Sequence, residues 1–251
     1  MTQPAGTLLR SWRRRRNRTQ LDLAHRAGVS PRHVSFIETG RSRPTSEMIL
    51  RLCDDLAVPL REQNRILLAG GFAPAHPEHA LADRSMREVN AAIEATLAAQ
   101  MPYPALVIDQ GWDLVAANDA VYALIEGVAP RLLEPPVNVM RLSLDPDGLA
   151  PRILNLDEWR AHLIGRLRRE YEASADPRLA ELLAGWPQPP PAKRSSSDLV
   201  VPFRLRVGDD DLSFISLTTV FGTAREVTLS ELAIEAFYPA DEATRSRLAR
   251  R

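Results

Sequence analysis

The sequence has very little cysteine, and it has no long apolar run. Cys53 is the single cysteine among 251 residues, which excludes an intrachain disulfide. No stretch approaches the ~20 consecutive apolar residues of a membrane-spanning helix, and residues 1–6 lack the apolar core of a secretory signal. These absences exclude a disulfide-stapled scaffold and predict a cytoplasmic protein that does not engage a membrane.

Signatures of common enzyme sites are also missing. The sequence contains no glycine-rich phosphate loop, no paired-histidine metal motif and no nucleophile elbow. His76 and His79 lie close together, but a proline separates them and no cysteine is near, which favours a solvated linker over a metal site. We therefore expect no catalytic residues, no metal and no cofactor.

Charge is distributed unevenly along the chain, although the formal net charge is zero. Residues 1–70 contain 13 arginines against 6 acidic residues, a balance of +7, so the remainder carries −7. The run Arg13 to Arg16, followed by Arg18, is the densest basic segment; a solvated helix surface is the alternative interpretation for part of it. Lys193 is the only lysine, so the use of arginine reflects composition. The asymmetry favours phosphate binding at the N-terminal end.

Residues 19–44 have the spacing of a helix-turn-helix. Thr19 and Ser30 stand where helix N-caps are expected, Gly28 supplies a turn that favours positive φ, and Pro31 suits a first helical position. The apolar positions that would face inward are Leu23, Ala24, Ala27, Val34 and Ile37. An ordinary helical hairpin that binds nothing is the alternative. Agreement at about ten positions with fixed spacing favours DNA binding instead.

The pattern over residues 26–44 carries a family resemblance: residues 7–70 resemble the Cro/XRE helix-turn-helix regulators. The resemblance implies a five-helix, all-α domain that binds a double-stranded DNA operator with the second helix of the motif in the major groove. By this resemblance the base-reading residues are Arg32, His33 and Phe36. The DNA-backbone residues are Thr19, Gln20, Ser30, Pro31, Ser35, Arg41, Ser42 and Arg43. The family often has glutamines where this chain has Pro31 and Arg32, and an arginine favours guanine in the half-site.

We expect the DNA-binding domain to occupy residues 1–73, with helices over 47–57 and 60–69, followed by a linker over 74–84. Cys53 would lie on the first of these helices beside Leu52 and Leu56, and the spacing predicts a small core residue. A redox-sensing role is the alternative, and nothing nearby in the sequence favours it.

A second domain is predicted over residues 85–251, with an α/β (α+β), PAS-like fold around a five-stranded antiparallel sheet. Residues 132–151 are proline-rich and loop-like, and 185–197 form a proline- and serine-rich connection. The expected helices cover residues 86–100, 118–125, 156–174 and 176–184. The expected strands cover residues 105–109, 112–117, 199–207, 212–223 and 228–238.

Three segments of this domain carry a second resemblance. They are residues 102–120, the pattern Asn138-x-x-Arg141-Leu142, and residues 236–241. Together with the N-terminal domain they resemble the MmyB-like transcription regulators. The resemblance implies a PAS-like domain that binds a fatty-acid-like, apolar effector.

Large and polar side chains of the second domain are candidates for that pocket. Arg141 or His162 would anchor a carboxylate, because a charge in an apolar pocket needs a partner; a surface position is the alternative for both. For each aromatic residue taken singly, the favoured interpretation is an ordinary core position. The candidate ligand-binding residues are Tyr103, Trp112, Tyr122, Asn138, Arg141, Trp159, His162, Phe203 and Phe214.

Three functions remain as hypotheses at this point. The first is a homodimeric repressor that binds a pseudo-palindromic operator and responds to the effector. The second is a DNA-binding regulator whose second domain serves only dimerisation or protein-partner binding. The third, an enzyme targeted to DNA, has the least support because the catalytic motifs are missing.

Overall fold

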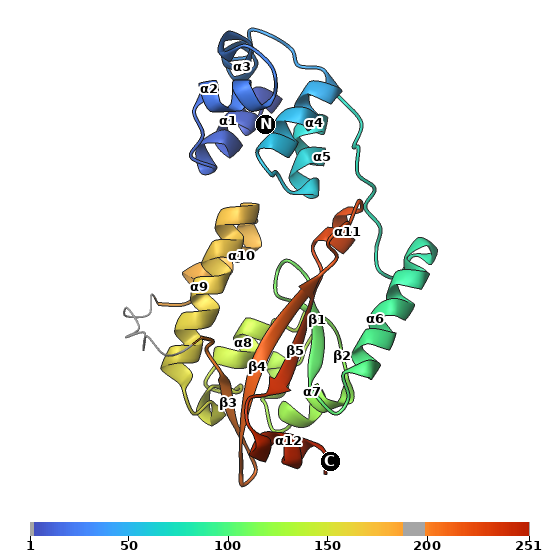
Figure 1. Cartoon of the computed structure of the whole chain (residues 1–251), viewed down its shortest axis with the longest axis vertical. Coiled ribbons are helices and arrows are strands. Elements are labelled where there is room, and N and C mark those ends of the chain that lie inside the picture. The colour runs from blue at the N-terminus through green and yellow to red at the C-terminus, as the bar shows by residue number, and fades with distance from the viewer. Residues whose placement is uncertain (1–2, 188–198, 251) are drawn as a thin grey trace. The chain divides into compact units, whose positions relative to one another are not determined.

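The structure is a computed structural model that describes residues 3–187 and 199–250 (Figure 1). Its contacts divide the chain into two units, Met1–His79 with Thr223–Ser230, and Ala80–Gly222 with Glu231–Arg251. The first boundary lies inside the expected linker. The division differs from two consecutive domains in one respect, because eight residues from near the C-terminus belong to the first unit.

The first unit contains the helix-turn-helix. Thr19 caps the first helix of the motif and shares a capping box with Asp22, whose backbone N–H donates to the Thr19 hydroxyl over 3.0 Å. Ser30 caps the second and accepts from the backbone N–H of His33 at 3.2 Å. Gly28, between them, has φ +64°. The helices are α1 (Ala5–Arg15), α2 (Gln20–Arg26), α3 (Pro31–Glu38), α4 (Ser46–Asp55) and α5 (Leu60–Ala69). The prediction of an all-α helix-turn-helix region is confirmed.

The core of this unit is apolar and includes the cysteine. Leu9, Ile37 and Ile49 are fully buried, and Cys53 has no exposed surface. Burial raises the pKa of the Cys53 thiol to about 12, so the thiol stays protonated at neutral pH. Cys53 therefore packs as a small apolar residue, as its spacing indicated.

One buried ion pair connects the first three helices. Arg13 on α1 forms two hydrogen bonds with Glu38 on α3, of 2.6 and 2.8 Å, and the amide of Gln20 on α2 donates to Glu38 over 2.8 Å. Burial alone would raise the pKa of Glu38, but the hydrogen bonds from Arg13 and Gln20 outweigh it and lower the pKa. The ionised carboxylate thus fixes the position of the helix that we expect to enter the major groove.

The residues after α5 differ from the solvated linker that we expected. The side chain of Asn64 on α5 accepts from the backbone N–H groups of Ala75 and His76, both at 3.0 Å, and donates to the His76 carbonyl. Helix α11 (Val227–Ser230) continues this hydrogen bonding, because the backbone N–H of Val227 donates to the Pro77 carbonyl over 2.9 Å. The histidine-containing segment is therefore fixed against the first unit.

The carboxylate of Glu226 completes this attachment. One of its oxygens accepts from the backbone N–H of His79 and the other from the backbone N–H of Leu229, each over 2.7 Å. The Thr228 hydroxyl also donates to the His79 carbonyl. These bonds explain why residues 223–230 belong to the first unit. They also explain why residues 228–230 form a helical turn where a strand was predicted.

The second unit is built on a five-stranded antiparallel sheet, as predicted, and its strand order is β2-β1-β5-β4-β3. Its strands are β1 (Ala105–Ile108), β2 (Leu114–Ala117), β3 (Phe203–Val207), β4 (Asp210–Val220) and β5 (Ala233–Pro239). Its α-helices are α6 (Arg87–Ala99), α7 (Asp119–Leu124), α8 (Val139–Leu144), α9 (Leu156–Ser174), α10 (Pro177–Ala184) and α12 (Glu242–Leu248). Short 3-10 turns are η1 (Arg84–Met86), η2 (Pro130–Leu132) and η3 (Ala150–Arg152).

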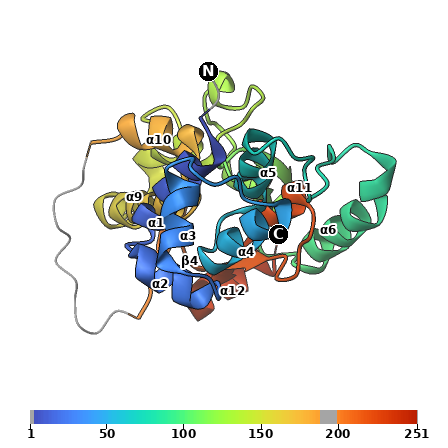
Figure 2. The ribbon, with the colours of Figure 1, turned by 90° about the horizontal axis from the view of Figure 1, so that it is seen from above.

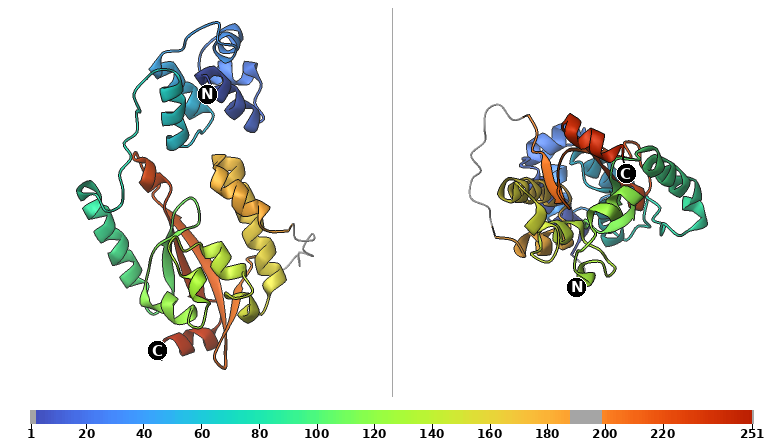
Figure 3. Two further views of the ribbon diagram at one scale, coloured as in Figure 1. Left: turned by 180° about the vertical axis from the view of Figure 1, so that it is seen from behind. Right: turned by 90° about the horizontal axis from the view of Figure 1, so that it is seen from below.

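Helices flank the sheet of this unit. Helices α9 and α6 lie to either side of β4 (Figure 2). Helix α12 lies near the C-terminus at one end of the sheet (Figure 3), where the hydroxyl of Thr244 accepts from the backbone N–H of Ser213 and Arg247 pairs with Asp210. One apolar core cluster is formed by residues of the sheet and of α7, α8, α9, α10 and α12.

The structure corrects several expected boundaries in this unit. The loop-like segment 132–151 contains α8, because the side chain of Asn138 accepts from the backbone N–H of Arg141 and caps that helix. The second strand begins at Leu114, since Trp112 has φ +65° and belongs to the turn. Most of the connection expected over 185–197 falls on residues 188–198, outside the described residues.

We expect Glu38→Ala to destabilise the first unit by about 3 kcal/mol, since removing one partner leaves the other charge buried and unpaired. Because the pKa of Glu38 is lower in the folded state, its stabilisation is complete above the unfolded value. It is lost as the pH falls through the folded value. Urea unfolding from pH 3 to 7 measures both effects, and an unchanged midpoint in the variant would contradict them. Glu47→Ala, on an exposed position of α4, is the matched control.

Candidate nucleic-acid interface and ligand cavity

The outward face of α3 brings three of the predicted DNA-contacting residues together. Arg32 is exposed, and its guanidinium lies 5.1 Å from the ring centroid of Phe36. The guanidinium of Arg41, in the loop after α3, lies 6.0 Å from the same ring. Cation–π contact limits the freedom of both arginines. Two cations are thus held around one aromatic ring at the surface of the expected recognition helix.

The remaining residues that we predicted to contact DNA differ in exposure and in hydrogen bonding. Pro31, Arg41 and Arg43 are exposed, while His33, Ser35 and Ser42 are partly exposed. Thr19 and Ser30 are exposed as well, and their hydroxyls already accept cap hydrogen bonds. Gln20 differs most from expectation, since its amide donates to Glu38 inside the domain. Its structural role is visible in the contacts, and its predicted phosphate contact stays a prediction.

The arginine run divides into structural and exposed members. Arg13 is buried against Glu38, and Arg16 donates to the carbonyls of Leu56 and Ala57 over 2.9 and 2.8 Å. Arg14 and Arg18 are exposed. The exposed pair is therefore better placed for phosphate contacts than the other two.

A cavity of about 100 Å³ lies inside the second unit. Most of its lining is apolar and comes from β1, α7, α8, α9, β3 and β5. The structure places four of the nine predicted ligand-binding residues on its wall: Trp112, Trp159, His162 and Phe203. Its volume is below the roughly 300 Å³ at which ordinary ligand pockets begin. It therefore accommodates a small molecule, and a long acyl chain requires it to widen.

The other five predicted residues lie off the cavity wall. Tyr103 packs against Tyr238, Tyr122 is more than half exposed, and Phe214 is fully buried beyond Phe203. Asn138 caps α8 and also donates to the Gly111 carbonyl, so its amide is occupied. Arg141 lines a separate polar cleft with Arg131 and Glu181. This position separates Arg141 from the cavity in which we expected it to anchor a carboxylate.

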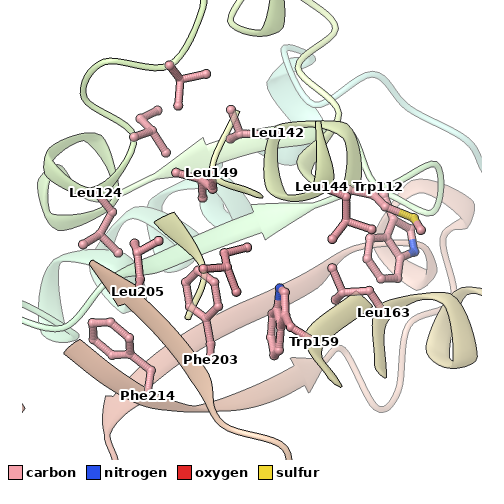
Figure 4. Close-up of a cluster of buried hydrophobic side chains, with 14 of the residues drawn as sticks. Trp112, Leu124, Leu142, Leu144, Leu149, Trp159, Leu163, Phe203, Leu205 and Phe214 are labelled. Atoms are coloured by element: carbon pink, nitrogen blue, oxygen red, sulfur yellow. The ribbon is translucent and has the colours of Figure 1, made fainter. Parts of the chain in front are cut away.

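An aromatic wall bounds the cavity on the side of α9. The indole of Trp159 stacks on His162 at 5.3 Å between centroids and packs against Phe203 at 4.8 Å. Its Nε1 donates to the Ser143 hydroxyl on α8 over 3.0 Å. Trp159, Phe203 and Leu163 lie within one apolar cluster in Figure 4.

The polar end of the cavity is formed by residues that the sequence analysis missed. Arg166 on α9 pairs with Glu235 on β5 at 2.6 Å and with Glu170 at 2.7 Å. Its guanidinium lies 4.9 Å from the ring centroid of Trp112, whose Nε1 donates to Glu170 over 2.6 Å. Two features of the sequence could have indicated this cluster. They are the i, i+4 spacing of Arg166 and Glu170 and the single charge in the apolar strand 233–237.

The pKa values of the two basic groups at this end shift in opposite directions, although burial lowers both. Burial alone would lower the pKa of Arg166, but the contacts with Glu235 and Glu170 raise it. Burial also lowers the pKa of His162, and the positive charges of Arg166 and Arg169 lower it further. At neutral pH His162 is therefore uncharged, and it is a poor partner for an anionic ligand.

Comparisons with known proteins assign a different family to each part of the chain. Residues 9–63 match the model of a helix-turn-helix family, and residues 89–250 match the model described as the MmyB-like transcription regulator ligand binding domain. Both resemblances stated from the sequence are thereby confirmed. A search of curated proteins found no match. Among solved structures, the clp gene regulator ClgR from Corynebacterium glutamicum aligns at 22% identity, over 39% of this chain and 90% of that chain, with a TM-score of 0.24.

Within 3–187 and 199–250, no three or more His, Cys, Asp or Glu side chains gather in a way that would hold a metal ion. No helix in those ranges has both the length and the apolar character needed to cross a bilayer.

We expect Arg32→Ala to weaken binding to the cognate operator about 5- to 150-fold, equivalent to roughly 1–3 kcal/mol, and to relax the preference at one base position. The physical reason is the loss of a bidentate contact to a base edge. Fluorescence anisotropy with operator and scrambled duplexes measures this effect. An equal loss on all sequences would identify Arg32 as a phosphate contact instead. Arg204→Ala, exposed on β3, is the matched control.

Trp159→Ala should destabilise the second unit by roughly 3–5 kcal/mol, because it removes a buried indole and leaves a hole in the aromatic wall. Scanning calorimetry should show a lower unfolding temperature for that unit, with DNA binding by the first unit retained. The matched control is Trp186→Ala, which changes a partly buried tryptophan. Equal effects of the two substitutions would contradict the assignment of Trp159 to the core of the cavity wall.

Proposed function

The chain belongs to the MmyB-like transcription regulators, and from this premise we propose that a small apolar effector in the second unit changes its affinity for an operator. The chain is a DNA-binding transcription regulator and not an enzyme. The observation that carries the proposal is the apolar cavity bounded by Trp159 and Phe203, within the part of the chain that matches the family's ligand-binding domain.

DNA recognition in this proposal is made by two copies of the chain. A homodimer would place two α3 helices in successive major grooves of a pseudo-palindromic operator. Arg32 would read a base edge, with Phe36 holding its guanidinium. Arg41, Arg43 and the exposed members of the arginine run would supply phosphate contacts that weaken with salt. We propose that the dimer acts in the cytoplasm as a repressor.

Chain connectivity provides a route from the cavity to the first unit. Glu235 and Phe237 on β5 line the cavity, while residues 223–230, immediately before β5, belong to the first unit. A shift of β5 would therefore act on the segment attached through Glu226. An effector controls DNA binding by this route only if it binds the two arrangements with different affinities.

One observation favours the alternative of a dimerisation or protein-partner domain. Among the described residues, β3 pairs with β4 only from Asp210 to Phe214, so residues 215–220 of β4 have an open edge. Leu217 and Val220 on this segment are more than half exposed. An open apolar strand edge is a common site for pairing with another chain. This function is compatible with the effector proposal.

The test combines native mass spectrometry with operator binding. We expect mass in excess of the 27.9 kDa chain, lost on organic extraction, and at least a fivefold change in operator affinity on its removal. The operator is first obtained by selection from random duplexes. Unchanged affinity after removal of the extra mass would contradict control by an effector and favour the dimerisation alternative.

A further inference from the structure

The polar end of the cavity has a charge balance that restricts its ligand. Arg166 is the one cation among the cavity-lining residues, and it faces the carboxylates of Glu235 and Glu170. His162 is uncharged at neutral pH because burial lowers its pKa. Arg169 and Glu158, which also act on His162, add one charge of each sign, so the balance at this end is negative by one unit.

The guanidinium of Arg166 already holds two carboxylates and one aromatic ring, with two of its five N–H donors. Its Nη2 bonds Glu235 at 2.6 Å, its Nε bonds Glu170 at 2.7 Å, and its face covers Trp112. A carboxylate ligand would have to displace one of these partners or add a third negative charge to a largely apolar space. Either change leaves one carboxylate without a neutralising positive charge, which is unfavourable away from water.

Glu235, by contrast, retains capacity to accept hydrogen bonds. Its side chain is buried, and Oε1 makes its two contacts, with Arg166 and with the hydroxyl of Thr218 at 3.1 Å. A carboxylate offers about four acceptor positions on its two oxygens. Among the described residues, Oε2 makes no hydrogen bond, so Glu235 can accept a proton donor that enters from the cavity.

We propose that the effector has an apolar body and a cationic, hydrogen-bond-donating head, a primary amine, which pairs with Glu235. Free fatty acids are disfavoured by the same charges. This inference rests on the proposed function and names the ligand class for the same cavity. An ammonium group would bring the charge of the cluster to zero and satisfy the free oxygen of Glu235.

The size of the cavity sets the size of the probes. An engineered apolar cavity of roughly 150 Å³ binds benzene, and the cavity here measures about 100 Å³. Six-carbon molecules are therefore the appropriate scale. Hexylamine, 1-hexanol and hexanoate share one chain length and differ only in the head group.

The experiment titrates each probe into the full-length protein at pH 7 and follows the tryptophan indole N–H signals by NMR. The signals of Trp112 and Trp159 report on the cavity, because both indoles line it and donate to neighbouring residues. Trp12 and Trp186 do not line it and serve as internal controls. We expect shifts confined to Trp112 and Trp159. Hexylamine should bind at least tenfold more tightly than hexanoate, with 1-hexanol between them.

Glu235→Gln should reduce the preference for hexylamine over hexanoate to less than threefold. Glu94→Gln, which removes the same charge from an exposed position on α6, should leave the preference unchanged. If Glu235→Gln does not fold, the order of affinities in the unmodified protein decides the question alone.

The outcomes separate this inference from the proposed function. Hexanoate binding as tightly as hexylamine, with shifts at Trp112 and Trp159, would overturn the amine assignment and leave an effector cavity in place. If no probe up to 20 mM shifts these signals, and organic extraction removes no extra mass from the protein, both the amine assignment and the effector proposal would be overturned.

Discussion

A carboxylate taken out of water must be compensated by hydrogen bonds or by an opposite charge, and this constraint organises the whole chain. Three glutamates are buried: Glu38, Glu226 and Glu235. Each is contacted by groups from a different element, and in Glu235 one oxygen makes these contacts. Glu38 joins α1, α2 and α3. Glu226, the residue before α11, joins this helix to the segment after α5. Glu235 joins β5 to α9. Each of these three carboxylates thus helps to hold the elements that contact it in place.

The first of these charges changes the interpretation of the basic N-terminal region. A count of arginines favours phosphate binding, but charge alone does not distinguish an arginine that meets DNA from one that neutralises a buried acid. Arg13 is required by Glu38, and Arg16 satisfies carbonyls at the end of α4. The side chains available to a polyanion are consequently those with exposed guanidiniums, such as Arg14, Arg32 and Arg41.

Sequence patterns predicted local structure well where neighbouring residues determine it. The caps at Thr19 and Ser30, the turn at Gly28 and the antiparallel sheet follow from short-range rules of backbone geometry and apolar spacing. They failed where a distant partner decides. Residues 228–230 have the β-branched and apolar composition of a strand, yet Glu226 caps them as a helical turn. Arg166 and Glu235 are 69 residues apart, and no local pattern indicates that these two residues pair with each other.

The second and third glutamates lie on one continuous segment, and this has a consequence for the proposed control by an effector. Glu226 holds its end of the segment to the first unit through backbone N–H groups, and Glu235, nine residues later, faces the cavity. A ligand that adds or removes a charge at Glu235 alters an interaction whose loss costs roughly 3–5 kcal/mol. Allosteric coupling of ordinary strength requires about 1–3 kcal/mol. In the proposed mechanism, a change at Glu235 is therefore large enough to bias the attachment made by Glu226. The covalent path between the two glutamates is residues 227–234, which contain α11 and the first two residues of β5.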